Sequence, residues 1–202
     1  AVYDNKIAPF LNEYVADTLK EEGVDSTIFH VGKEAITSCM ACGACTKLGK
    51  CVVNDKVNEF VELAQDYDGY VIGSPVHYAS SSGATVAFMD RVFYVDSMAK
   101  RRTFYLKPAA TVVSARRAGT TASLDVINKY FTINQMPVVA STYWNQAYRD
   151  TDGTITTDTE GQQTLHHLGI NMAWLLRCIE IGKKHDITPP THTKTAHTGF
   201  LA

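Results

Sequence analysis

Five stretches of the chain repeat apolar residues at every third or fourth position, which is the spacing of an amphipathic helix. These stretches are residues 6–22, 54–68, 83–99, 122–134 and 158–185. The last of them contains Gly161 and Gly169. We expect these two glycines to interrupt that helix, because glycine is a poor helix former.

Shorter, continuously apolar stretches between the helices are typical of buried strands. We expect strands at residues 25–31, 69–75, 109–115 and 136–142. Helices and strands alternate with short connections, which predicts a three-layer α/β domain with a doubly wound parallel sheet. In such sheets ligands bind beyond the carboxyl ends of the strands.

The start of the chain departs from this pattern. A doubly wound sheet normally opens with a strand, a phosphate-binding loop and a helix, whereas this sequence opens almost directly on the helix at residues 6–22. A missing central strand would leave unpaired strand edges inside the protein, at a cost of about 1–3 kcal/mol for each lost hydrogen bond. We therefore expect that a first strand and its phosphate loop are missing from the sequence.

The composition fits one globular domain of 202 residues, with 45% apolar and 20% charged residues. We expect a domain over residues 1–185, with a cysteine loop at 38–52, and a Pro- and Thr-rich tail at 186–202. The net charge is −2 without a long basic run, which argues against nucleic acid or an anionic membrane as the main partner. No apolar stretch is long enough to cross a bilayer, and we expect a cytoplasmic protein.

Four of the five cysteines fall within thirteen residues, in the spacing Cys-x2-Cys-x2-Cys-x5-Cys. They are Cys39, Cys42, Cys45 and Cys51. Thiols stay reduced in the cytosol, so these are better read as metal ligands or redox groups than as disulfides. The fifth, Cys178, has apolar neighbours and is expected to be a buried helix residue.

A cubane iron–sulfur cluster fits this spacing better than zinc does. Zinc sites usually pair two Cys-x2-Cys knuckles a dozen or more residues apart, whereas a cubane offers four iron corners to one wrapping loop. Gly43 and Gly49 permit the turns, and Lys47 and Lys50 would offset the negative charge of the cluster. Val52 follows the last cysteine where ferredoxins have proline. Packing cysteines, or zinc, remain the alternatives.

A second candidate site lies in "IGSPVHYASSSGATVAFMDR", residues 72–91. A buried strand that ends in Ser-Pro, followed by His-Tyr and small residues, suits a flat aromatic ligand such as a flavin. "SARRAGTT", residues 114–121, would flank its other edge, where Arg116 or Arg117 could favour an anionic reduced flavin. An ordinary strand–loop–helix crossover with serine caps explains the residues equally well. Arg91, at the end of the first stretch, is expected to lie on a solvated face with Arg101 and Arg102.

Together these segments resemble a known family. Residues 73–91 are similar to the flavin-contacting segment of the NAD(P)H-dependent FMN reductase branch of flavodoxin-like proteins, and "CMACGACTKLGKC" resembles the cluster motif of its iron–sulfur flavoproteins. The resemblance covers residues 6–185 and implies a [4Fe–4S] cluster on the four clustered cysteines. It implies FMN contacts from Ser74, Pro75, Val76, His77, Tyr78, Ser114, Ala115, Arg116 and Gly119. The phosphate loop of the family is absent, and His77 stands where an aromatic residue is usual.

The expected function is that of an FMN-dependent oxidoreductase with a [4Fe–4S] cluster, which passes electrons from NAD(P)H or ferredoxin to a small acceptor. The family resemblance also implies a homodimer or homotetramer. Two alternatives stay open: a plain FMN, quinone or nitro reductase with structural or zinc-binding cysteines, and a non-enzymatic iron–sulfur carrier or sensor. The sequence has no Gly-x-Gly-x-x-Gly fingerprint, so it does not choose between the electron donors.

Overall fold

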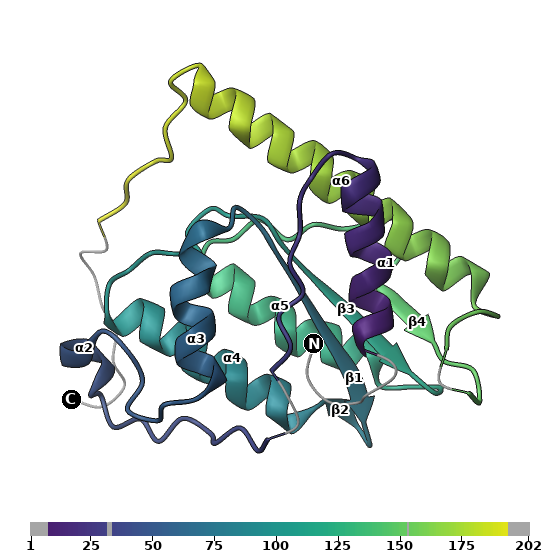
Figure 1. Ribbon diagram of the computed structural model, residues 1–202, viewed down its shortest axis with the longest axis horizontal. Coiled ribbons are helices and arrows are strands. Elements are labelled where there is room, and N and C mark those ends of the chain that lie inside the picture. The colour runs from purple at the N-terminus through teal and green to yellow at the C-terminus, as the bar shows by residue number, and fades with distance from the viewer. Residues whose placement is uncertain (1–7, 32–33, 153, 194–202) are drawn as a thin grey trace.

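The computed structural model describes residues 8–31, 34–152 and 154–193. Its sheet has the order β2-β1-β3-β4 (Figure 1). The strands are β1 (Tyr70–His77), β2 (Ser80–Ser81), β3 (Ala109–Ala115) and β4 (Gln146–Tyr148). β1, β3 and β4 run parallel, and β2 turns back against the end of β1.

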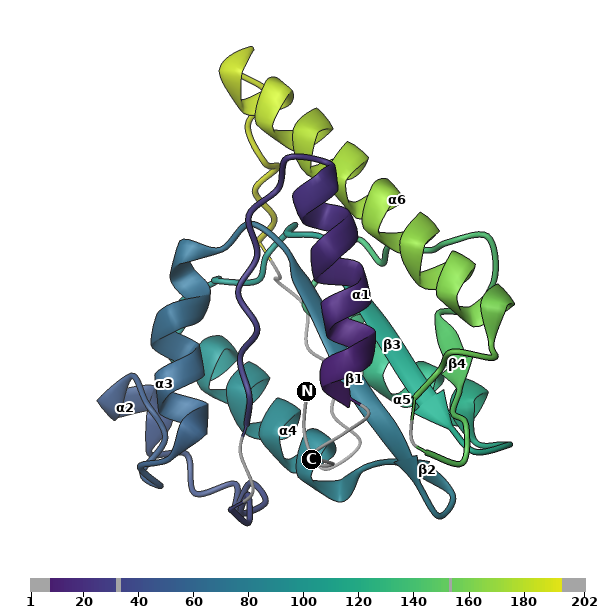
Figure 2. The ribbon, with the colours of Figure 1, turned by 45° about the vertical axis from the view of Figure 1, so that its right-hand side comes forward.

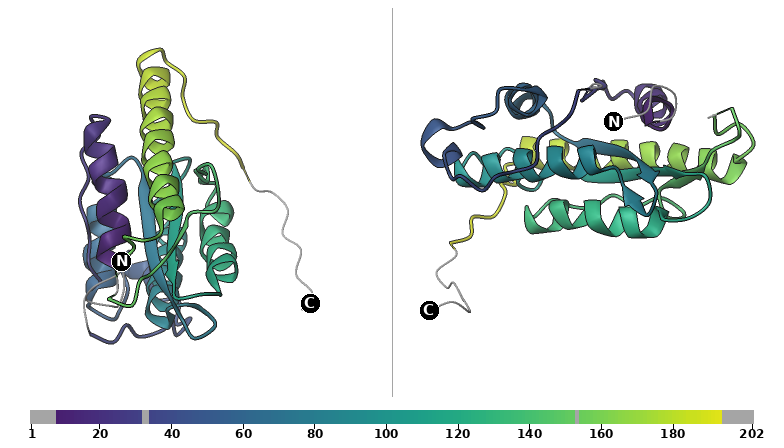
Figure 3. Two further views of the ribbon diagram at one scale, coloured as in Figure 1. Left: turned by 90° about the vertical axis from the view of Figure 1, so that its right-hand side faces the viewer. Right: turned by 90° about the horizontal axis from the view of Figure 1, so that it is seen from below.

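Helices cover both faces of the sheet, and each face has its own apolar core. One face carries α1 (Ala8–Glu21) and α6 (Thr159–Lys184), which pack on Ala110 and Val112 of β3. The opposite face carries α3 (Lys56–Leu63), the 3-10 turn η1 (Ala64–Asp66), α4 (Gly83–Met98) and α5 (Thr120–Ile133). Figure 3 shows α1 and α5 on opposite sides of the strands. The expected three-layer arrangement is therefore present.

The helix predictions are confirmed within the described residues, while residues 6 and 7 of the first predicted helix lie outside them. The prediction that Gly161 and Gly169 interrupt the last helix is wrong, because α6 is continuous from Thr159 to Lys184. Gly169 instead allows α1 and α6 to approach, since a Cβ there would lie 2.6 Å from Cβ of Thr18. The short helix α2 (Cys45–Leu48) lies within the cysteine loop.

The strand predictions are confirmed at β1 and β3, but not at the other two segments. Residues 136–142 form only an isolated bridge at Val138, and the third parallel strand is β4, a few residues later. Residues 25–31 form no strand and pass between α1 and α3 (Figure 2). A cavity of about 720 Å³ separates that segment from β1. The segment has no ladder partner there, and a strand needs one.

One finding concerns membranes. None of the helices in the described part of the chain combines the length and the apolar character that crossing a bilayer requires.

Candidate functional site

Two of the predicted flavin segments leave neighbouring strands at the same edge of the sheet. β1 and β3 pair in parallel, and Pro75 lies opposite Ser114. The hydroxyl of Ser74 is fully buried and organises the first loop, where it accepts hydrogen bonds from the Ser82 amide and the Thr85 hydroxyl, each at 3.2 Å. Ser82 also caps α4 by accepting a bond from the Thr85 amide. The first loop therefore passes directly into the start of α4.

Gly119 joins the second loop to the first. Its φ of 91° lies in the left-handed region, and a Cβ at this position would meet Cγ1 of Val76 at 2.8 Å and the carbonyl oxygen of Ala79 at 2.9 Å. Only a residue without a side chain allows this approach without strain. The structure thus brings the two sequence segments into direct contact.

The predicted flavin residues divide into a buried base and an exposed rim. Ser74, Pro75, Ser114 and Ala115 are buried. The other members are half-buried or exposed: Val76, His77, Tyr78, Arg116 and Gly119. The side chain of Tyr78 is fully exposed on a backbone with a φ of 62°. A planar ligand at this rim could meet the tyrosine ring together with the backbone of both loops.

The four clustered cysteines line one small cavity of about 20 Å³, beside Tyr94 and Val95 of α4. Cys42 is exposed, Cys45 is buried, and Cys39 and Cys51 are intermediate. Burial raises the pKa of the Cys45 thiol. Cys178 is exposed on α6, so the prediction that it is buried is wrong.

Tight backbone turns bring the four cysteines to this cavity. Ala41, Gly43 and Gly49 have positive φ angles of 50°, 68° and 70°. Gly49 ends α2 by donating its amide to the carbonyl oxygen of Cys45 at 2.9 Å. The expected role of the two glycines in turning the loop is confirmed, and Ala41 takes a third such turn.

Arg91 is a site residue that the sequence analysis placed wrongly. It lies on α4 with only 2% of its surface exposed, so it is not part of a solvated face. Its Nε and Nη2 atoms donate to Sγ of Cys51, each at 3.3 Å, and its two Nη atoms hold Asp55 at 2.5 and 2.9 Å. A lone arginine within the otherwise apolar face of this helix was the available signal, because a buried charge requires a partner.

The charge of Arg91 is maintained in this environment. Burial opposes the charged form, but the hydrogen bonds that Arg91 donates to Asp55 and Cys51 outweigh burial and raise the pKa of Arg91. Asn58 binds the backbone of the same cysteine. Its Oδ1 accepts from the Cys51 amide at 2.9 Å, and its Nδ2 donates to the Cys51 carbonyl at 3.0 Å.

Among the described residues, no three His, Cys, Asp or Glu side chains are grouped as a single metal ion would require. The four thiols share a cavity without converging on one point. The two candidate sites are connected by α4, which begins at the flavin loops and passes the cysteine cavity at Arg91. Eight residues separate Gly83 from Arg91 along the helix, which is about 12 Å at 1.5 Å per residue.

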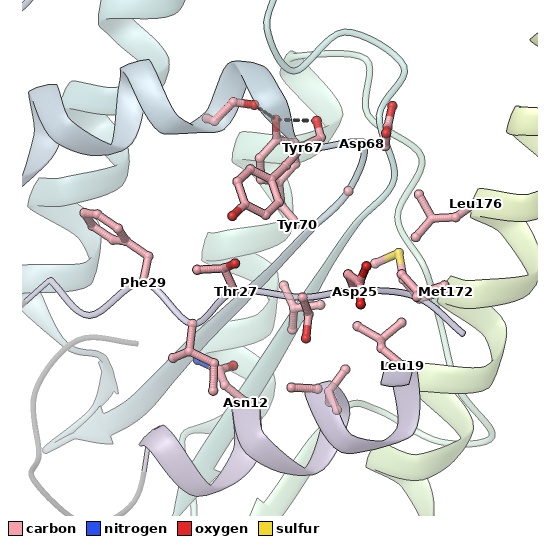
Figure 4. A pocket seen from close by; sticks show the side chains of 18 of the residues that line it. Asn12, Leu19, Asp25, Thr27, Phe29, Tyr67, Asp68, Tyr70, Met172 and Leu176 are labelled. Atoms are coloured by element: carbon pink, nitrogen blue, oxygen red, sulfur yellow. Dashed lines mark hydrogen bonds between the residues drawn. The ribbon is translucent and has the colours of Figure 1, made fainter. Parts of the chain in front are cut away.

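The large cavity between α1, α3 and α6 contains none of the predicted site residues (Figure 4). It follows the free edge of β1, which pairs with β3 on its other side from Tyr70 to Pro75. Oδ1 of Asn12 is buried beside this cavity without a hydrogen-bond partner. The cavity therefore lies along a strand edge that has no ladder partner from Tyr70 to Pro75 among the described residues.

Comparisons with known proteins found relatives that cover most of this chain. An iron–sulfur flavoprotein of Methanocaldococcus jannaschii is 26% identical over 173 residues, which is 81% of this chain and 87% of the relative. An iron–sulfur flavoprotein of Methanosarcina thermophila is 28% identical over 147 residues, covering 68% of this chain and 75% of the relative.

Solved structures support the fold. A WrbA-like flavodoxin from Agrobacterium tumefaciens superposes with a TM-score of 0.60 at 12% identity, over 88% of this chain and 94% of that one. At this identity the likeness shows the fold alone, and it confirms the expected flavodoxin-like architecture. The family model described as NADPH-dependent FMN reductase matches residues 3–149. The chain belongs to this family of FMN-dependent oxidoreductases.

Proposed function

We propose that this protein is an FMN-dependent oxidoreductase that also carries a [4Fe–4S] cluster, and that it passes electrons from NAD(P)H or ferredoxin to a small acceptor. One observation carries the proposal: all four cysteines of the compact motif line a single cavity against α4, the helix that begins at the proposed flavin loops. The proposed FMN-binding domain extends to residue 185. Residues 186–193 follow it without helix or strand, and residues 194–202 of the expected tail lie outside the described part of the chain.

The donor set favours a cluster over zinc. Four thiolates on one tetrahedral zinc ion would each lie about 2.3 Å from the same point, whereas the four irons of a cubane lie at separate corners. The thiols here share a cavity without meeting the geometry of one ion, as far as the described residues extend. The two N–H groups that point at Cys51 suit a charged sulfur better than a neutral thiol.

The flavin would occupy the open rim formed by the loops after β1 and β3. Tyr78 and His77 are exposed there and could cover a ring face, while Arg116 is exposed on the second loop and could stabilise negative charge on a reduced flavin. Ser74 would act indirectly, since its hydroxyl already bonds within the first loop. FMN when bound supplies hydride and electron transfer chemistry.

The spectrum and iron content of anaerobically purified protein test the proposal. The expected result is flavin absorption over a broad shoulder that dithionite bleaches, with about four irons per chain. Cys42→Ser should lose most of the iron, because Cys42 lines the cavity. Cys178→Ser is the matched control, since that cysteine is exposed and does not line the cavity, and it should retain the iron. Flavin without iron would favour a plain reductase, and iron without flavin would favour a carrier or sensor.

We also propose that the protein is a homodimer or homotetramer. Trp174, Cys178 and Ile181 are exposed at spacings of four and three residues, so they share one face of α6. An exposed apolar helix face is typical of a contact surface. Light scattering of the wild type and of Trp174→Glu tests this proposal. A wild-type monomer would contradict it.

A further inference from the structure

Arg91 is connected to the cysteine cavity by more hydrogen bonds than helix packing requires. Besides Asp55 and Cys51, its guanidinium donates to the carbonyl oxygens of Val53 at 3.0 Å and Thr37 at 3.3 Å. An arginine has five N–H donors, and these contacts engage all of its nitrogens. The Nε atom has one hydrogen, and its partner is the sulfur of Cys51.

The carboxylate of Asp55 partly offsets the positive charge of the Arg91 guanidinium. Asp55 is the N-cap of α3 and accepts from the Val57 amide at 3.1 Å, while both of its oxygens accept from Arg91. Arginine and aspartate together are neutral, so the positive end that Cys51 meets is partly compensated. Without the carboxylate, the sulfur would face an unbalanced cation.

Hydrogen bonds to the sulfurs and the net charge nearby are two of the factors that set the reduction potential of an iron–sulfur cluster. One-electron reduction adds a negative charge, so N–H donors and positive charge at a ligand sulfur favour the reduced form. Arg91 supplies both to Cys51, and Asp55 counteracts the charge.

We propose that Arg91 is a positioning residue that orients Cys51 toward the cluster and that the Arg91–Asp55 pair sets the reduction potential of that cluster. This inference rests on the proposed function, since it requires a cluster on the four cysteines. It assigns opposite effects to the two members of the pair: Arg91 raises the potential and Asp55 lowers it.

Two substitutions test the pair in anaerobically purified full-length protein. Arg91→Lys keeps a positive charge but removes the two-nitrogen contact with the sulfur, and it should lower the equilibrium constant for uptake of one electron from dithionite about tenfold, or about 59 mV. Asp55→Asn keeps a good helix cap and leaves Arg91 uncompensated, so it should move the potential in the opposite direction. The potential is read from the electron paramagnetic resonance signal of the reduced cluster.

Arg101 provides the matched control. Its Nε and Nη2 atoms donate to the carbonyl oxygen of Gly49 at 3.1 and 2.7 Å, and it pairs with Glu62, so it braces the same loop without touching a sulfur. Arg101→Lys should therefore leave the potential unchanged. If Arg91 were only a structural brace, both lysine variants would lower thermal stability and neither would shift the potential.

The outcomes separate this inference from the proposed function. Opposite shifts in Arg91→Lys and Asp55→Asn, with none in Arg101→Lys, support the inference. Wild-type iron content with equal potentials in all variants overturns it and leaves the cluster in place. If Arg91→Lys does not fold, as judged by circular dichroism, Asp55→Asn alone decides by the sign of its shift. A wild-type protein without iron overturns both the cluster and the inference.

Discussion

Gly119 offers the sharpest test of how the two proposed flavin loops are joined. Replacing it with alanine places a Cβ 2.8 Å from Cγ1 of Val76 and 2.9 Å from the carbonyl oxygen of Ala79, on a backbone whose φ is 91°. The valine methyl can rotate away, but the carbonyl belongs to the backbone of the first loop and can move only with that loop. The substitution therefore pushes the two loops apart.

The size of the effect follows from two costs and one gain. A left-handed backbone costs a residue with a Cβ about 1–2 kcal/mol, and overpacking at a close contact adds about 1–3 kcal/mol. The lower entropy of the unfolded alanine chain returns about 0.4–1 kcal/mol. At the midpoints of these ranges, the free energy of unfolding should therefore fall by about 3 kcal/mol. In a domain of this size, that corresponds to a decrease in Tm of roughly 5–15 °C.

Gly83→Ala is the matched control for Gly119→Ala. Gly83 is the first residue of α4, its φ is not positive, and a Cβ there would have no atom within 4 Å. Urea unfolding should show this variant at or slightly above wild-type stability. FMN binding, followed by quenching of flavin fluorescence, should weaken in Gly119→Ala and stay unchanged in Gly83→Ala. Equal unfolding midpoints for the two variants would refute the reasoning.

Further substitutions test the rim, the helix packing and one acidic loop. Tyr78→Ala should weaken FMN binding without lowering Tm, because the ring is fully exposed, whereas the control Tyr143→Ala, at 53% exposure, should change neither. Gly169→Ala should cost about 1–3 kcal/mol in urea unfolding, since its Cβ would lie 2.6 Å from a side-chain atom of α1. Gly182→Ala, with its nearest neighbour at 3.7 Å, should be neutral or stabilising by up to about 1 kcal/mol. Hydrogen bonds from Thr157 lower the pKa of Asp150 from 3.8 to about 2, so the stability of this loop should be present above pH 4 and lost between about pH 4 and 2. Chemical shifts of the loop amides should show that acid transition in the wild type and lose it in Asp150→Asn.

The elements that could be predicted from sequence are those whose signal is local. The strand predicted at residues 109–115 matches the bounds of β3. Its residues are continuously small or apolar in sequence, and all seven are buried in the structure. The meeting of the loops after β1 and β3 can also be predicted, since it follows from the parallel pairing of these two strands. These predictions required periodicity and one topological rule, and no knowledge of distant contacts.

Two of the errors share one physical cause, which is dependence on a distant partner. Residues 25–31 have strand-like composition, but their side of β1 is occupied by a cavity, and a strand forms only where a ladder exists. The sequence does not reveal that Arg91 is buried, because its partners Cys51 and Asp55 are 40 and 36 residues away in sequence. A charge within an apolar helix face signals that a partner exists, but it does not identify the partner.

The position of α4 constrains how the proposed cofactors would communicate. Gly83 begins the helix at the proposed flavin loops, and Arg91 meets the cysteine cavity about 12 Å further along the axis, as eight residues at 1.5 Å each require. A helix packed along most of its length holds that separation within one chain, whatever the oligomeric state. The proposed flavin and cluster sites therefore lie on one helix of a single subunit. Variants that shift the cluster potential through Arg91 should change the rate of electron transfer between the two sites without changing FMN affinity.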